Sequence, residues 1–303
     1  MVIRLIPNPN VQSPAAVNTK TMSDKHVDIL ILGAGWTFQF LEPLLRKEGV
    51  IFAATTTSGH DNTIPFRFDP DSKDEEPYKA LPSATTVLIT FPLKGEGQSK
   101  RLVDLYAATH SSSHPQWIQL GSTGIFSSPS WNDNRSQYDK SNLRAIAEDE
   151  LLSLGNSCVL DLAGLYGGAR DPRNWLARVA KTKDQLKAKG AVHFIHGADV
   201  AQAILAAHRS FKSINGQRWI IADLRMYDWW ELAIRWGGQE YARWVGELMD
   251  EEEVRALPRP VEKLGRVLDS RAFWKAVDVY PVMGIPGGKL DASDASYQPM
   301  QSK

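Results

Sequence analysis

Two early glycines have the spacing of a phosphate-binding turn. Gly33 and Gly35 directly follow the apolar run VDILIL and precede a segment whose apolar residues recur with helical spacing. Glycines at such a junction allow a tight turn and let the backbone approach a pyrophosphate, whose charge the helix N-terminus stabilises. We therefore expect dinucleotide binding at Gly33, Gly35, Trp36 and Thr37. The alternative is a strand-to-helix turn of the same shape that binds no ligand.

Phe38 occupies the position at which a third glycine is expected in such a turn. That glycine normally lets the helix pack close to the strand. A phenylalanine is expected either to push the helix outward or to turn its ring into the cleft, where it would hinder the cofactor. We predict weak binding, which Phe38→Gly would tighten; an unchanged affinity would show that Phe38 is a bystander.

The end of the second expected strand indicates which nicotinamide cofactor is favoured. An NAD site usually offers Asp or Glu to the ribose hydroxyls about 20 residues after the first glycine. Residues 53–60 contain no carboxylate, and Thr56, Thr57 and Ser58 supply hydroxyls that could bond to a 2′-phosphate. The sequence therefore favours NADP(H) over NAD(H), although no arginine flanks these residues.

The hydrophobic pattern predicts a scaffold that brings several strand ends to one edge. Short apolar runs alternate with helical periods over residues 26–225, which implies a doubly wound parallel sheet covered by helices on both faces. Residues 226–303 are helical and rich in tryptophan, which indicates a small, mainly helical C-terminal substrate lobe that ends in a flexible tail. Residues 1–25 are rich in Pro, Asn, Ser and Thr and are expected to form a disordered N-terminal tail.

Composition excludes several classes of partner. The 303 residues carry 35 basic and 35 acidic side chains, so no overall field favours nucleic acid or an anionic membrane. The single Cys158 excludes an internal disulfide and a multi-cysteine metal site. No apolar run approaches the ~20 residues that a transmembrane helix needs. We expect no metal, a small-molecule substrate and a cytoplasmic location.

Eight segments occur in the order typical of the short-chain dehydrogenase/reductase superfamily. They are LILGAGWTFQFLEPLL, ATTTS, LITFPL, QLGSTGIFSS, LRAIAEDELL, LDLAGLYGGARDP, VHFIHGADVAQAI and VLDSRAFWKAVDVYPVMGIPGG. Over residues 27–288 the chain resembles the extended, epimerase/dehydratase-like branch, and within it the atypical group that opens with Gly-x-Gly-Trp. This resemblance implies a Rossmann core, a C-terminal substrate lobe and NAD(P) binding, with Phe91 and Pro92 of LITFPL at the cofactor.

The resemblance also locates candidate catalytic residues. In this superfamily a Ser or Thr after the fifth strand orients the substrate oxygen, and GSTGIF places Ser122 there with Thr123 beside it. A Tyr-x-x-x-Lys pair on the next helix exchanges the hydroxyl proton, and the lysine is needed because tyrosine at its ordinary pKa of about 10 is a poor base.

The family pair is replaced in this chain. Counting back from Glu148, the lysine and tyrosine positions hold Arg144 and Lys140. These two residues are either a basic, solvated helix turn or contacts to the cofactor or substrate. Tyr138 is two residues out of register, and at ~100° per residue it leaves the helix face, so it could act as the base only if its loop reorganises.

A few other polar residues have expected roles. Ser141 is expected to cap a helix over residues 141–154, and Asp199 to cap the helix that it begins, with His196 satisfied beside that cap. Arg170 and Arg173 follow the sixth strand, where substrate contacts belong.

These residues leave three functions open. The first is an NADP(H)-dependent oxidoreductase or epimerase-like enzyme that could form a homodimer and acts on a small, partly apolar carbonyl or imine substrate without the Tyr-x-x-x-Lys pair. The second is a non-catalytic dinucleotide-binding redox sensor or regulator. The third is a cofactor-independent enzyme that reuses the fold.

Overall fold

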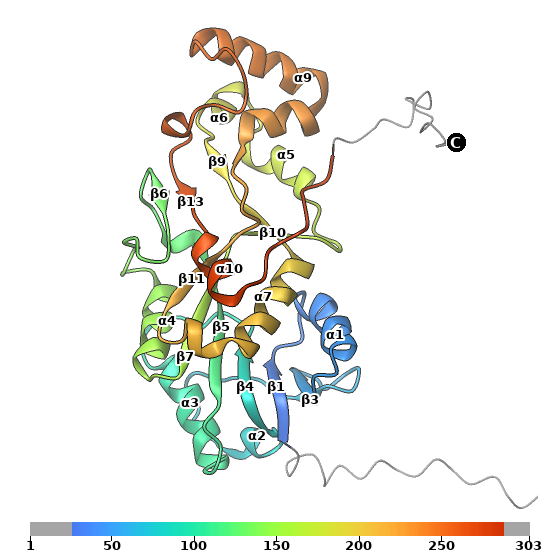
Figure 1. Cartoon of the computed structure of the whole chain (residues 1–303), viewed down its shortest axis with the longest axis vertical. Helices are drawn as coiled ribbons and strands as arrows, with labels where there is room; N and C mark the ends of the chain where they lie inside the picture. The colour runs from blue at the N-terminus through green and yellow to red at the C-terminus, as the bar shows by residue number, and fades with distance from the viewer. Residues whose placement is uncertain (1–25, 288–303) are drawn as a thin grey trace, which may run out of the picture.

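A seven-stranded, all-parallel sheet forms the centre of the molecule (Figure 1). The structure is a computed structural model, and it describes residues 26–287. The strands lie in the order β11-β7-β5-β4-β1-β2-β3. They are β1 His26–Leu32, β2 Phe52–Thr56, β3 Ile64–Pro65, β4 Ser83–Ile89, β5 Gln116–Ser122, β7 Ser157–Leu162 and β11 Arg218–Ile221. The chain order reverses between β1 and β4, the switch point at which open α/β sheets bind their ligands. The predicted doubly wound parallel sheet is confirmed.

Successive side chains of the central strand enter two different cores. Ile29 and Ile31 belong to one core, and Leu30 and Leu32 belong to the other, because side chains alternate across a strand. Helices α1 Phe38–Lys47, α7 Gly197–Arg209, α8 Phe211–Ile214 and α10 Arg271–Val277 contribute to the first core. Helices α2 Glu76–Lys79 and α3 Gln98–Thr109 contribute to the second, together with part of α4 Leu143–Ser153. The near-continuous apolar strands are therefore buried on both faces.

A third core forms a lobe beyond the carboxyl ends of the strands, at the top of Figure 1. Its longest element is α9 Trp229–Glu251, which is kinked at Gly238. The lobe also takes 3-10 helix η3 Pro172–Trp175, α5 Leu176–Val179 and α6 Lys183–Lys187 from the middle of the chain. Among the described residues, no helix combines the length and apolar composition that crossing a bilayer requires.

Short elements connect the core and the lobe. Three two-stranded ribbons pair β10 Phe194–His196 with β8 Gly164–Tyr166, β12 Tyr227–Asp228 with β9 Ala191–Val192, and β13 Val267–Leu268 with β6 Trp131–Asn132. Two further 3-10 turns are η2 Thr123–Ile125 and η4 Val261–Lys263. The predicted N-terminal tail, and the part of the predicted C-terminal tail beyond residue 287, lie outside the described residues.

One buried ion pair holds the lobe together. Asp228 caps α9 by accepting from the Trp230 amide at 2.9 Å. The same carboxylate binds the Arg259 guanidinium at 2.7 Å, and that guanidinium lies 3.9 Å from the centre of the Trp230 ring. Asp228 and Arg259 are 0% and 5% exposed, so either charge would be left in a dry interior without the other.

We therefore expect Asp228→Ala to lower the free energy of unfolding by about 3–5 kcal/mol, because the buried Arg259 loses its partner. Urea unfolding followed by circular dichroism measures this change. Arg271→Ala is the matched control, since its ion pair with Asp269 is at the surface and contributes about 0–1 kcal/mol. Equal effects of the two variants would contradict the role assigned to Asp228.

Candidate functional site

Two adjoining cavities lie at the carboxyl ends of β1, β2, β4 and β5. The first, which we call the β2 cavity, has a volume of about 540 Å³ and is lined by Gly33, Thr57, Phe91 and Arg67, among others. The second, the Ser122 cavity, has a volume of about 260 Å³. It is lined by the predicted residues Gly35, Trp36, Thr37, Ser122 and Arg144, and also by Arg170. Pro92 lines both cavities, so they meet at the switch point of the sheet.

The turn after β1 is held in one conformation by two threonines. The Gly33 amide donates to the Thr55 hydroxyl at 3.0 Å, and the Thr90 hydroxyl donates to the Gly33 carbonyl at 2.6 Å. Gly33 has φ +98°, and a Cβ there would lie 2.6 Å from Thr90 Oγ1. Only glycine fits this position, and the turn leads directly to the N-terminus of α1 at the edge of the Ser122 cavity.

Phe38 lies outside both cavities. Its ring packs edge-on against Phe52 with the centroids 6.1 Å apart, in a groove that it shares with Glu42 and Arg46. The expected intrusion of the ring into the cleft is therefore wrong. Phe38 is the first residue of α1, and the helix turns its side chain toward β2.

The predicted Phe91 shapes the β2 cavity together with Phe66, Phe68 and Arg67, which the sequence analysis missed. The rings of Phe68 and Phe91 are nearly parallel, at 16°, with their centroids 6.0 Å apart. Arg67 stands between the aromatic residues Phe66 and Phe68 in the chain and lines the cavity with Thr57. No arginine flanks the end of β2 in sequence, but pairing of β2 with β3 brings Arg67 to it. The alternation Phe-Arg-Phe after β3 is the sequence signal that could have indicated these cavity residues.

Two of the predicted β2 hydroxyl residues have other positions. Thr56 Oγ1 is 2.7 Å from Thr63 Oγ1 and accepts from the Gly59 amide at 2.9 Å. Thr56 and Ser58 do not line the β2 cavity, whereas Thr57 and the unpredicted Thr55 do. The hydroxyls available there are therefore those of Thr55 and Thr57, of which Thr55 already accepts from the turn.

Ser122 and Arg144 meet at the Ser122 cavity from different elements. Ser122 ends β5, and its Oγ accepts from the Gly124 amide at 3.2 Å. Arg144 comes from the first turn of α4 and donates to the Leu120 carbonyl at 3.2 Å. Thr123 is buried, and its hydroxyl donates to the Leu162 carbonyl at 3.4 Å. The structure thus brings Ser122 and Arg144 together and gives Thr123 a packing role.

The structure does not bring Tyr138 and Lys140 to this cavity. Helix α4 begins at Leu143 and is capped by Asn142, not by the predicted Ser141, so both residues precede the helix. The Tyr138 hydroxyl donates to Asp149 at 2.7 Å, and the Arg218 guanidinium lies 4.1 Å from its ring centre. Burial raises the pKa of Tyr138, and the hydrogen bond to Asp149 raises it further. Tyr138 is therefore a poor base and does not line the Ser122 cavity. Its prediction as a catalytic residue is corrected.

A clasp formed by Trp36 and Arg170 covers the start of α1. The Trp36 indole N–H donates to the Gly167 carbonyl at 3.2 Å, and the Arg170 guanidinium lies 4.3 Å from the indole centre. Arg173, which was expected beside it, binds Asp171 at 2.8 Å and does not line either cavity. Arg170 is therefore the cation that this loop contributes to the site.

The expected helix cap at Asp199 is wrong. His196 caps α7, since its Nδ1 accepts from the Ala198 amide at 3.1 Å, and burial lowers the pKa of this imidazole. Asp199 instead accepts from the amides of Val282 and Met283 at 3.1 and 3.0 Å. It therefore ties the C-terminal segment to the first turn of α7.

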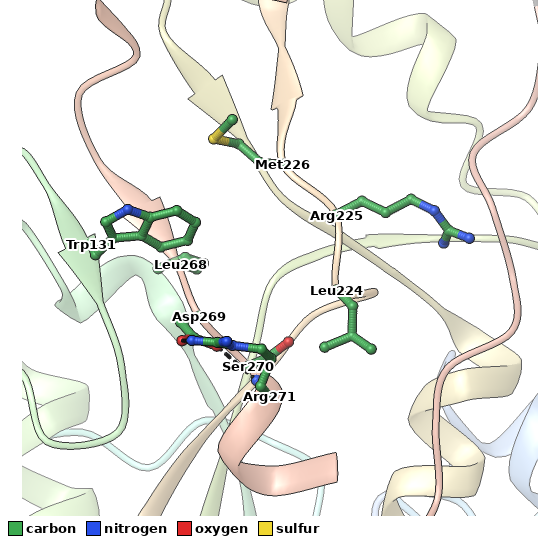
Figure 2. Close-up of a pocket in the computed structure, with 8 residues that line it drawn as sticks. All are labelled: Trp131, Leu224, Arg225, Met226, Leu268, Asp269, Ser270 and Arg271. Carbon is green, nitrogen blue, oxygen red and sulfur yellow. Dashed lines mark hydrogen bonds and ion pairs between the residues drawn. The ribbon is translucent and has the colours of Figure 1, made fainter. Parts of the chain in front are cut away.

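A third cavity, of about 560 Å³, lies apart from the predicted residues (Figure 2). Trp131 of β6 faces Leu224 and Met226 across it, and the ion pair of Asp269 and Arg271 lies at its base. None of the residues assigned to the cofactor or to catalysis lines this cavity.

No protein-family model and no curated protein matches the chain. A UDP-N-acetylglucosamine 4-epimerase from Bacillus cereus is 13% identical, with a TM-score of 0.54 over 84% of this chain and 94% of the epimerase. The yeast methylglyoxal/isovaleraldehyde reductase Gre2, complexed with NADPH, is 15% identical, with a TM-score of 0.51 over 84% of this chain and 94% of the reductase.

The likeness is one of fold. RMD from Pseudomonas aeruginosa, complexed with NADPH, is also similar, with 12% identity and a TM-score of 0.53 over 85% of this chain and 94% of RMD. The first two neighbours are described as an epimerase and a reductase, and the third is a complex with NADPH. At such identities they establish a Rossmann-like architecture and leave the chemistry to the site itself.

The observed position of Phe38 changes the expected effect of Phe38→Gly on cofactor binding. We now expect Phe38→Gly to leave the dissociation constant of NADPH unchanged, because the ring lies outside both cavities. The free energy of unfolding should fall by about 2 kcal/mol, since a ring is lost and a glycine enters the helix. Fluorescence titration and thermal unfolding measure the two effects. Tighter binding in the variant would restore the view that Phe38 blocks the cofactor.

Proposed function

We propose that the chain binds NADP(H) across the two cavities and acts as an oxidoreductase or epimerase-like enzyme on a small, partly apolar carbonyl or imine substrate. The charge of the lining residues carries this proposal. Arg67 and Lys94 line the β2 cavity, Arg144 and Arg170 line the Ser122 cavity, and no carboxylate among residues 26–287 lines either one. A groove lined by cations favours a polyanionic ligand. The two cavities together extend from Phe68 to Ser122 along the switch point of the sheet, where a dinucleotide binds in such folds.

Preference for NADP(H) rests on the β2 cavity. An adenine ring would lie among Phe66, Phe68 and Phe91, and the adjacent ribose would face Thr57 and Arg67. Arginine binds phosphate through paired N–H donors, and no acidic side chain in the lining repels a 2′-phosphate. The glycine turn and the start of α1 would receive the pyrophosphate.

The Ser122 cavity can orient and polarise a substrate carbonyl. A bound nicotinamide supplies or accepts a hydride. Ser122 Oγ would hold the substrate oxygen, and Arg144 would stabilise negative charge that develops on it. With Tyr138 outside the cavity, the proton that completes the reaction would come from water held by Ser122 and Arg144. The apolar wall of Leu120, Leu162 and Leu165 suits a partly apolar substrate.

A redox sensor is the second candidate. None of the side chains lining the Ser122 cavity is a tyrosine or a lysine, which favours binding without turnover. The third candidate, a cofactor-independent enzyme, would use the same cavity without a nucleotide. We also propose, from the sequence resemblance, that the chain belongs to the Gly-x-Gly-Trp group, and that it acts in the cytoplasm as a homodimer.

Cofactor preference is tested by titrating the protein with NADPH and with NADH. We expect NADPH to bind more tightly, and Arg67→Gln to weaken NADPH about ten-fold with little effect on NADH, because only the 2′-phosphate loses a partner. Arg243→Gln, at an exposed position on α9, is the control for a lost surface charge. Tighter binding of NADH by the native protein would overturn the preference.

Turnover separates the enzyme from the sensor. A panel of aldehydes, ketones and imines is screened with NADPH, and the loss of reduced-nicotinamide absorbance is followed. We expect Ser122→Ala to lower kcat about 100-fold with an unchanged dissociation constant for NADPH, and Tyr138→Phe to retain kcat.

Other outcomes of the screen identify the alternatives. Tight binding of NADPH with no turnover of any compound would favour the sensor. Failure of both nucleotides to bind would remove the enzyme and the sensor together and leave the cofactor-independent enzyme.

A further inference from the structure

A charged cluster is buried directly behind the wall of the Ser122 cavity. Glu148 of α4 and Asp161 of β7 are both 0% exposed, and Arg218 of β11 is 5% exposed. The Arg218 guanidinium donates to Glu148 Oε2 at 2.8 Å and to Asp161 Oδ2 at 3.3 Å. It also donates to Asp149 at 2.6 Å. One guanidinium thus serves three carboxylates.

The two remaining oxygens of the buried acids lie close to the same point beside Gly121. A Cβ placed on Gly121 would lie 2.2 Å from Asp161 Oδ1 and 2.8 Å from Glu148 Oε1, so both oxygens crowd the same point. Within the described part of the chain, neither oxygen has a hydrogen-bond partner. Two ionised carboxylates in this position would repel each other in a dry interior. One proton between them would satisfy both oxygens.

The surrounding groups relieve this repulsion only in part. From α4 the pair is faced by Arg144 and Asp149, and from β11 by Arg218, whose guanidinium also lies over the Tyr138 ring. From β5 the backbone N–H of Ser122 is directed to Asp161, and Gly121 lies beside both acids. Burial raises the pKa of Asp161 well above its ordinary range, and the neighbouring Glu148 raises it further. Burial raises the pKa of Glu148 as well, although Arg218 opposes this.

Arg144 connects the acid pair to the cavity. Its Nε is buried, has no hydrogen-bond partner among the described residues, and lies 4.0 Å from Glu148 Oε1. The same side chain lines the Ser122 cavity and is 30% exposed. A small inward movement would therefore pair Arg144 with Glu148, at the expense of its contact with the cavity.

We propose that Glu148 and Asp161 share one proton and that this proton keeps Arg144 available to an anionic ligand in the Ser122 cavity. While the proton is present, Glu148 Oε1 and Asp161 Oδ1 bond to each other and do not compete for Arg144. When it dissociates to water, the pair gains a second negative charge, and Glu148 draws the Arg144 guanidinium inward. Glu148 and Asp161 are positioning residues, and their role in ligand binding rests on the proposed function.

The sign of the pH dependence follows from the raised pKa values. A carboxyl whose pKa is raised by folding keeps its proton above the pH at which a free carboxyl loses it. Ligand affinity is therefore highest at low pH and falls as pH rises through the transition of the pair. Asp161→Asn and Glu148→Gln each replace the shared proton with a permanent amide N–H, so either variant should keep the low-pH affinity throughout.

The test measures the dissociation constant of NADPH between about pH 5.5 and pH 9. The native protein should lose about ten-fold in affinity relative to either amide variant as pH rises, which is the effect of one lost charged contact. Titration of NADPH itself is common to all proteins and cancels in this ratio. Asp223→Asn is the matched control, because burial raises the pKa of Asp223 to about 6 in a group remote from Arg144. A constant ratio across this range, or opposite shifts in the two amide variants, would overturn the proposal.

A second readout needs no ligand. The Nε–H resonance of Arg144, assigned by its loss in Arg144→Lys, should shift with pH in the native protein and remain constant in Asp161→Asn. If NADPH binds at no pH, the proposed function fails. The pH dependence of this resonance still tests whether the proton shared by Glu148 and Asp161 controls Arg144. A resonance that does not move in the native protein would overturn the shared proton as the control of Arg144.

Discussion

The backbone at Gly33 fixes how helix α1 leaves the sheet relative to strands β1, β2 and β4. β1 lies between β2 and β4 in the sheet, and threonines from these two neighbours, Thr55 and Thr90, hold the Gly33 amide and carbonyl. The positive φ and the missing Cβ let the chain turn within this narrow space. The direction of α1, the mouth of the β2 cavity and the edge of the Ser122 cavity all follow from that turn.

Charge gives this framework its specificity. The core of the sheet is apolar, so polar chemistry concentrates at the carboxyl edge, where the strands end and the backbone is open to a ligand. The cations at that edge come from separate elements: Arg67 after β3, Arg144 on α4 and Arg170 after β8. Among the acids, Glu148 and Asp161 are buried with Arg218, and Asp228 is buried with Arg259. The positive lining of the groove is thus a property of the tertiary structure and cannot be read from a chain of zero net charge.

Much of the fold could be predicted from the sequence, because apolar runs and helical periods are local signals. The parallel sheet and the glycine turn followed from them, whereas Ser122 and Arg144 were located by the resemblance to the short-chain dehydrogenase/reductase superfamily. Contacts made across the sheet could not be predicted in this way. Arg67 reaches the end of β2 only through strand pairing, and the start of α4 was expected at Ser141 because local spacing did not show that Asn142 is the cap. Local spacing could not show that the ring of Phe38 turns toward Phe52.

The C-terminal segment, residues 279–286, constrains the order in which the lobe and the sheet are joined during folding. Val279 packs against the first core of the sheet and Ile285 against the core of the lobe, and Figure 1 shows the segment running between them. Asp199 holds its amides at residues 282 and 283, and the Trp236 indole donates to the Pro286 carbonyl at 3.3 Å. The lobe is therefore fastened to the sheet by residues synthesised after both. During translation these contacts between the lobe and the sheet can therefore form only after residues 279–286 have been synthesised.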